Sequence, residues 1–263
     1  MPIVTISRGS YWRGKAVAEQ VAEELGYECL SRDVLIETST QFNVPEVRLV
    51  RALHDAPSLL DRFSRGRERY MAFFRAALLN HLKKGNIVYH GLGGQYFLKE
   101  ISHILKVRII ADMEERIHDE MRREGINADD ARYTLKKDDD ERRRWGRQLW
   151  GVDPWDANLY DMVLHIDHLS VDNAVELIKT AIQMPNFQPT AQSRRQLNDL
   201  STAANVQAAL IEHWNASVTA KNGHVHASIK APQNLKDKIT PEAESLARRV
   251  EGVQRISITF LPY

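Results

Sequence analysis

The residue pattern best suited to chemistry lies within the first sixteen residues. An apolar run over residues 2–6 leads through Ser7 and Arg8 into a segment that matches the spacing G-x-x-x-x-G-K. In a loop of this kind, backbone N–H groups and the start of the next helix surround a phosphate, and the lysine adds a mobile positive charge. We therefore expect this segment to bind the phosphates of a nucleotide. The residues expected to line it are Gly9, Ser10, Tyr11, Trp12, Arg13, Gly14, Lys15 and Ala16.

Ala16 stands where phosphate loops of this type carry a serine or threonine that binds Mg²⁺. Three interpretations are open at the sequence level. Substrate phosphates and water hold the ion, or the hydroxyl of Ser7 or Ser10 takes over, or metal binding and catalysis are both lost. The bulky Tyr11 and Trp12 are also unusual for such a loop, and they either stack on a base or cover the edge of a sheet.

A second charged cluster extends over residues 132–147 and contains the run Arg142-Arg143-Arg144 directly after four acidic residues. Arginines that close over a transferring phosphoryl group stabilise the charge on its oxygens. The alternative is a solvated helix in which acidic residues pair with arginines three or four positions later. Together with a phosphate loop, the mobile arginine lid is the better hypothesis, and Lys15, Arg142 and Arg144 are its candidate catalytic residues.

The composition limits the class of protein. The chain has 263 residues, of which 43% are hydrophobic and 27% charged, and a formal net charge of +1. Such a balance predicts a globular core and gives no reason to expect nucleic-acid binding. The single cysteine, Cys29, is typical of a reducing compartment, and no apolar run reaches the ~20 residues that a membrane span needs. We expect a cytoplasmic protein without a transmembrane segment.

Short apolar strands alternate with amphipathic helices over the first 182 residues, which predicts an α/β domain with a mainly parallel sheet flanked by helices. Helices are expected over 15–25, 34–40, 45–84, 113–124 and 171–182. Strands are expected over 2–6, 27–30, 87–90, 107–111 and 163–166. The predicted fold is of the P-loop NTPase type.

A smaller α+β domain is expected at the C-terminus. Residues 1–184 would form the P-loop domain, 185–196 a linker, and 197–263 the small domain. In the last part, Asn222-Gly223 is a strong hairpin turn signal between two alternating runs. Helices from about Leu197 to Trp214 and over 241–250, and a strand over 255–260, complete it.

These stretches together resemble the cytidylate kinase-like family of P-loop nucleoside monophosphate kinases. The resemblance rests on residues 3–8, 85–94 and 107–111 with Arg116, on 140–144 and on 160–167, and it covers about residues 1–182. It implies ATP and Mg²⁺ as cofactors, nucleotides as ligands and a nucleoside monophosphate such as CMP as acceptor. Lys15 would bind donor phosphates, Arg116 would lie near the donor base, and Arg142 and Arg144 would belong to the lid. The arginine-rich insert over 44–82 would hold the acceptor, whose implied contacts are Asp33, Arg48, Arg51, Gly91 and Gly93.

The C-terminal part resembles a BON-like module through Asn222-Gly223-His224-Val225 and the run over 250–256. This resemblance implies a protein or small-ligand partner, and packing or homo-oligomerisation is the alternative. Three functions therefore stay open. They are an enzyme that transfers the γ-phosphoryl group of ATP to a nucleoside monophosphate, a nucleotide-binding regulator that acts through its C-terminal module, and a kinase of another small molecule.

Overall fold

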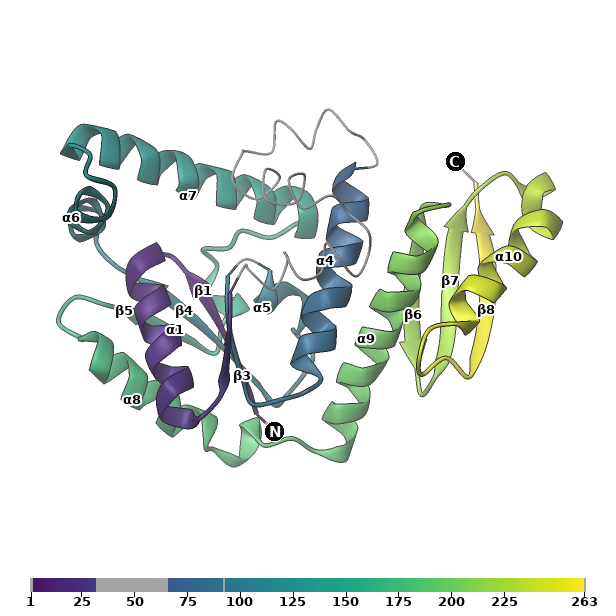
Figure 1. Cartoon of the computed structure of the whole chain (residues 1–263), viewed down its shortest axis with the longest axis horizontal. Coiled ribbons are helices and arrows are strands. Elements are labelled where there is room, and N and C mark those ends of the chain that lie inside the picture. The colour runs from purple at the N-terminus through teal and green to yellow at the C-terminus, as the bar shows by residue number, and fades with distance from the viewer. Residues whose placement is uncertain (1, 32–65, 92, 263) are drawn as a thin grey trace. The chain divides into compact units, whose positions relative to one another are not determined.

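The structure is a computed structural model that describes residues 2–31, 66–91 and 93–262 (Figure 1). These residues form two compact units. The first unit comprises residues 2–31, 85–91 and 93–189, and the second comprises residues 66–84 and 190–262. Within the described ranges, no helix is both long and apolar enough to cross a membrane.

The first unit is built on a five-stranded sheet in which all neighbouring strands are parallel, in the order β2-β3-β1-β4-β5. The strands are β1 (Ile3–Arg8), β2 (Glu28–Leu30), β3 (Ile87–His90), β4 (Ile104–Ile110) and β5 (Met162–His165). The predicted α/β class with a mainly parallel sheet is confirmed. The carboxyl ends of β1, β3 and β4 meet at one edge, where parallel sheets place their ligands.

Helices connect these strands. They are α1 (Tyr11–Leu25), α5 (Gly94–Phe97), α6 (Met113–Glu124), α7 (Ala128–Trp150) and α8 (Val171–Ile182), with 3₁₀ turns at Ala157–Leu159 and Pro185–Phe187. The observed bounds of α6 and α8 are the predicted ones. Helix α8 begins with a capping box between Ser170 and Asn173, a local signal that sequence alone supplies.

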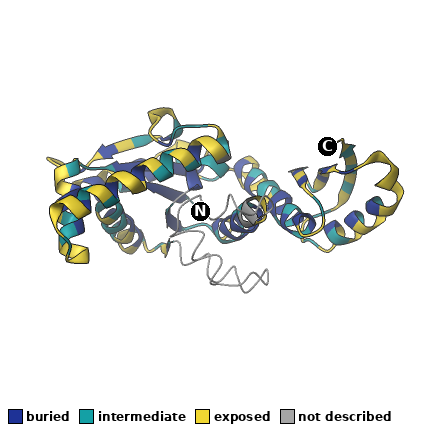
Figure 2. Cartoon of the chain, turned by 90° about the horizontal axis from the view of Figure 1, so that it is seen from above, coloured by how far each residue is buried: buried dark blue, intermediate teal, exposed yellow. Residues whose placement is uncertain are grey.

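One face of the sheet is covered by α1 and α8, which contact each other (Figure 1). Strand side chains alternate between faces, so Val4 and Ile6 of β1 join Val107 of β4 in this apolar core. Strands β1, β3 and β4 are almost entirely buried, whereas the outer faces of the helices are exposed and yellow in Figure 2. The same alternation places Ser7 and its register partner Arg108 on the opposite face, at the carboxyl edge.

The described part of the second unit joins three α-helices to a small mixed sheet in the order β6-β7-β8, with β6 and β7 antiparallel and β7 and β8 parallel. Its elements are α4 (Gly66–Leu82), α9 (Ala191–Ile211), β6 (Ala216–Lys221), β7 (His224–Lys230), a 3₁₀ turn at Gln233–Leu235, α10 (Lys236–Arg248) and β8 (Arg255–Leu261). Asn222 and Gly223 have φ values of 51° and 74°, so the predicted hairpin turn is confirmed. The likeness to a BON module stays a prediction.

Helix α9 begins at Ala191, six residues before the expected start near Leu197, because a capping box between Thr190 and Ser193 starts it earlier. The helix packs against α4 within this unit. The Asn80 amide donates to Asn205 Oδ1 at 3.0 Å, and Asn80 Oδ1 accepts from the Ser201 hydroxyl at 2.8 Å. Part of the arginine-rich insert is thereby tied to the C-terminal part of the chain.

Candidate functional site

The junction between β1 and α1 is shorter than a phosphate loop. Helix α1 begins at Tyr11, with Ser10 as its N-cap, and not at Lys15 as the motif predicted. The N–H groups of Gly9 and Ser10 both donate to the carbonyl of Ile109, at 2.7 and 3.1 Å. The first helical bond runs from the N–H of Gly14 to the carbonyl of Ser10. The N–H groups of the first turn of α1 have no acceptor within the helix, so these are the groups that can donate to an anion.

The two glycines of the motif allow close packing. A Cβ on Gly9 would lie 2.8 Å from the carbonyl oxygen of Ile109 in the neighbouring strand. A Cβ on Gly14, which is inside α1, would lie 2.8 Å from Cγ of Arg8. The motif spacing thus coincides with two points where backbone and side chains of neighbouring elements approach each other.

The remaining motif residues are engaged on or beside α1. The Lys15 ammonium lies 3.6 Å from the Glu19 carboxylate one turn later and 5.6 Å from the ring centre of Trp12, whose residue is 48% exposed. Ala16 follows on the helix with no hydroxyl. The Arg13 guanidinium donates to Asp119 at 3.0 Å, which joins α1 to α6.

Arginines do gather where β1 ends. Arg142, from the middle of α7, donates to the carbonyl of Arg8 at 2.8 Å. The Arg8 guanidinium lies 4.4 Å from the ring centre of Tyr11, and that of Arg123 lies 4.9 Å from the same ring. The arginine-rich helix and the candidate phosphate-binding segment are thus in contact, although 134 positions separate the two residues that form the hydrogen bond.

A buried polar cluster lies beneath this junction, and we call Ser7, Gln95, Arg108 and Tyr160 the edge cluster. Arg108 donates to Ser7 Oγ at 3.3 Å, and Tyr160 Oη lies 3.1 Å from the same oxygen. Gln95 donates to Tyr160 at 3.3 Å. The side chains of all four residues are buried. Sequence reasoning did not single out Arg108, although an arginine inside an apolar strand that is covered on both faces is a signal.

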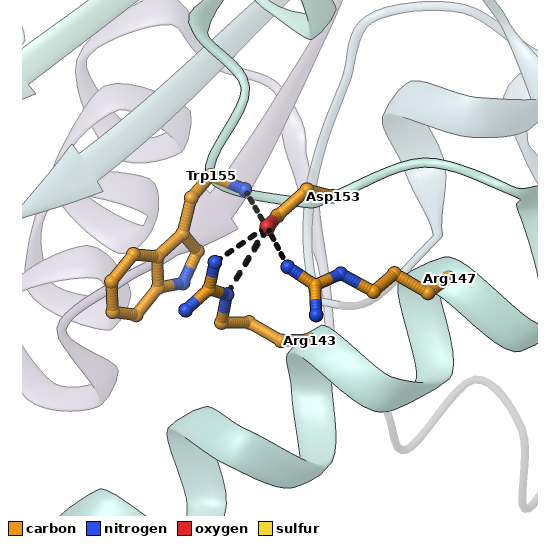
Figure 3. A network of polar contacts seen from close by, with 4 residues as sticks. All are labelled: Arg143, Arg147, Asp153 and Trp155. Atoms are coloured by element: carbon orange, nitrogen blue, oxygen red, sulfur yellow. Dashed lines mark hydrogen bonds and ion pairs between the residues drawn. The ribbon is translucent and has the colours of Figure 1, made fainter.

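The carboxylate of Asp153 binds two arginines of α7, Arg143 and Arg147 (Figure 3). Its carboxylate accepts from Arg143 at 2.7 Å, from Arg147 at 2.8 Å and from the backbone N–H of Trp155 at 3.0 Å. The hydrogen bonds from Arg143 hold the pKa of Asp153 far below its usual range. Arg144, predicted as a lid residue with Arg142, is exposed.

Arg116, which the family resemblance places near the donor base, forms a bidentate pair with Asp139 of α7 at 2.7 and 2.9 Å. Both residues are buried, at 9% and 8% exposure. In this structure the Arg116 guanidinium therefore links α6 to α7.

Of the acceptor-site residues, Gly91 and Gly93 lie between β3 and α5. The Gly91 N–H donates to the carbonyl of Ile6, and Gly93 caps α5 with a φ of 92°. Asp33, Arg48 and Arg51 lie outside the described residues.

The described residues fit a phosphate better than a protein-bound metal ion. Among them, no group of three or more histidine, cysteine, aspartate or glutamate side chains is placed to bind a metal. The side chain of Ala16 likewise supplies no oxygen ligand. A Mg²⁺ ion that accompanies a nucleotide would need its ligands from phosphates and water.

Comparison with known proteins identifies the family. Residues 3–168 match the model of the cytidylate kinase-like family, which is more than half of the chain. The chain belongs to this family. A cytidylate kinase of Methanopyrus kandleri is 29% identical over 114 residues, 43% of this chain and 51% of that protein. A cytidylate kinase of Thermococcus kodakarensis is 27% identical over 100 residues, 38% of this chain and 51% of that protein. The chain thus spans about half the length of the curated relatives it matches.

A solved structure of an uncharacterized protein from Eubacterium ventriosum has the same fold, with a TM-score of 0.54 and 19% identity. The match covers 69% of this chain and 98% of that one. This solved structure shows the fold alone, and it is the family match over residues 3–168 that confirms the sequence resemblance to the cytidylate kinase-like family.

Proposed function

We propose that this member of the cytidylate kinase-like family transfers the γ-phosphoryl group of ATP to a nucleoside monophosphate, with CMP as the first candidate acceptor. The observation that carries the proposal is the gathering of Arg8, Arg108 and Arg142 at the carboxyl end of β1. The family match and the curated relatives named cytidylate kinase support it. Such a site suits a ligand with several phosphate groups, because arginine binds phosphate oxygens with paired hydrogen bonds.

The chemistry asked of the protein is positioning and charge stabilisation. The first turn of α1 offers N–H groups to one phosphate, and Arg142 lies close enough to reach the same region. Lys15 would have to leave Glu19 to join them. Because that pair is 3.6 Å apart and exposed, breaking it costs little, on the order of 0–1 kcal/mol.

A second candidate is a nucleotide-binding regulator with weak or no catalysis, whose C-terminal unit engages a protein or a small ligand. Two observations favour it. Ala16 lacks the hydroxyl that usually binds the metal, and the N–H groups of Gly9 and Ser10 are already used by Ile109. Such a protein would bind ATP and change its C-terminal unit without turning over an acceptor.

A coupled assay of ADP release separates these functions. It is run with ATP, Mg²⁺ and each of CMP, UMP, dCMP, AMP and GMP, on the wild type and on Lys15→Ala. Turnover of one acceptor that falls at least tenfold in Lys15→Ala supports the enzyme. If no acceptor is turned over above the variant, the kinase is excluded. Calorimetry with ATP, and hydrogen exchange of α9 to β8 with and without it, then tests the regulator.

A further inference from the structure

Arg108 is a buried cation whose charge is not balanced within the part of the chain that the structure describes. Its residue is 8% exposed, and Ser7 Oγ accepts the one hydrogen bond that its guanidinium makes there. The ring centre of Tyr160 lies 5.7 Å away. A guanidinium carries five N–H donors, so most of its hydrogen-bonding capacity is unused by these partners.

Two acidic residues in the connection from α7 to β5, which also carries Tyr160 of the edge cluster, already have cationic partners. Asp153 is held by Arg143 and Arg147, and Asp161 lies 3.0 Å from the ammonium of Lys106. Lys106 and Arg108 lie on the same face of β4, two residues apart. Lys106 thus has a carboxylate partner, whereas Arg108 has none among the residues that the structure describes.

An unpaired cation in the protein interior carries a large desolvation penalty. Natural proteins retain such a penalty mainly where function requires it, and a ligand anion that completes the site would remove it. The position of Arg108 agrees with a ligand site, because β4 presents it at the carboxyl edge of a parallel sheet.

The surroundings of Arg108 also point to a ligand. Its terminal nitrogen Nη2 would lie 3.3 Å from a Cβ built on Gly9, which places the guanidinium directly at the β1–α1 junction. There the N–H groups of the first turn of α1 have no helical partner. A buried cation and a helix N-terminus thus meet at one place.

We propose that Arg108, supported by Ser7 and Tyr160 of the edge cluster, binds a phosphate group of a nucleotide substrate at the junction of β1 and α1. The assignment of the anion to a nucleotide rests on the proposed function. Donor and acceptor carry the same phosphate chemistry, so the experiment treats them as separate arms.

The test compares Arg108→Met with the matched variant Lys106→Met. Methionine has a similar length and no charge in both cases. Urea unfolding without ligand measures stability, and calorimetry measures the affinities for CMP, ATP, inorganic phosphate and cytidine. We expect Arg108→Met to unfold at a higher urea concentration than the wild type, because an unbalanced charge has been removed. We expect Lys106→Met to unfold at a lower urea concentration, because Asp161 loses its cationic partner and keeps only the backbone N–H of residue 106.

For ligands, we expect Arg108→Met to weaken binding of CMP or ATP at least tenfold, which identifies the nucleotide whose phosphate it binds. Cytidine should bind the variant and the wild type within twofold of each other, and Lys106→Met should keep the wild-type nucleotide affinities. The proposal is overturned if Arg108→Met binds both nucleotides as tightly as the wild type, or if it is less stable or does not fold.

The outcome is independent of the kinase assay. Arg108-dependent nucleotide binding without turnover would retain the phosphate site and reject the kinase. Turnover by the wild type, together with nucleotide affinities that Arg108→Met leaves unchanged, would support the kinase and reject the phosphate site at Arg108.

Discussion

At the scale of single residues, the two glycines of the phosphate-loop pattern have different surroundings. A Cβ on Gly9 would meet the carbonyl oxygen of Ile109, which belongs to a buried strand and cannot move freely. A Cβ on Gly14 would lie 2.8 Å from Cγ and 3.1 Å from Cβ of Arg8, which are close to the backbone of β1. Gly14 lies inside a helix, however, where alanine is favoured over glycine by about 1 kcal/mol. The same substitution should therefore have unequal effects at the two positions.

We expect Gly9→Ala to lower the free energy of unfolding by about 1–3 kcal/mol, as overpacking typically does. We expect Gly14→Ala to cost about 1 kcal/mol less than Gly9→Ala, because the gain in helix propensity offsets part of the close contact with Arg8. Urea unfolding followed by circular dichroism measures both. Equal losses at the two positions would contradict the close-packing explanation and favour a loop conformation that only glycine allows.

Arg116 shows how a residue that a family pattern assigns to a ligand is held by the protein itself. It is buried and shares two hydrogen bonds with Asp139. Arg116→Met should lower the free energy of unfolding by about 3–5 kcal/mol, because it leaves a buried carboxylate unpaired. The double variant Arg116→Met/Asp139→Leu should regain most of the lost stability, because neither charge of the pair is then left without a partner. A double variant that is as unstable as Arg116→Met would show that the unpaired Asp139 carboxylate does not cause the loss of stability.

At the scale of elements, the connection from α7 to β5 is held by the carboxylate of Asp153. Arg143 holds the pKa of this group far below its usual range. A carboxyl pKa that is depressed in the folded state stabilises the protein above the unfolded-state pKa of about 3.9, and this stabilisation is lost as the pH falls below that value. The side chain is 25% exposed, so the effect is moderated by solvent.

Asp153→Asn should therefore be less stable than the wild type by about 1–2 kcal/mol at pH 7, because Arg143 and Arg147 lose the negative charge and one of the two oxygens that they share. The difference should narrow as the pH falls from about 5 to about 2, because the unfolded wild type takes up a proton at this carboxyl group that the folded state does not yet bind. Urea titrations at pH 7, 5, 4 and 3 test this. A difference that is the same at every pH would mean that Asp153 acts through its shape and not its charge.

The elements also show what a single sequence can predict. Helices α6 and α8 were placed correctly, because apolar spacing, caps and stop signals all lie within them. The start of α1 was wrong, because a match to a loop motif was preferred to Ser10, an ordinary N-cap residue. Asp153 and Arg108 were missed for another reason. Their partners lie on other elements, and only the fold brings them together.

At the scale of the whole molecule, the sequence predicted an independent domain over residues 1–184, and the contacts of α4 bear on that prediction. The helix carries buried side chains along much of its length: Ala72, Phe73, Phe74, Ala76, Ala77, Leu78, Leu79 and Leu82. It packs on α9, and its Asn80 bonds to Asn205 and Ser201. Which helix covers another is decided by tertiary packing, which apolar spacing along one chain does not specify.

A chain that ends at Pro189 lacks α9 and leaves part of α4 without its partner. We expect this truncated chain to bind a hydrophobic dye and to self-associate, because newly exposed apolar surface of this kind drives aggregation. The α4 amides should also exchange at least tenfold faster than in the full chain, since the helix loses the packing that protects it. Sedimentation, dye fluorescence and hydrogen exchange of residues 66–84 measure these effects, with Asn205→Ala in the full chain as a control that removes only a polar link. If the truncated chain is monomeric, binds no dye and protects α4 as well as the full chain does, residues 1–189 fold independently and α9 contributes nothing essential to them.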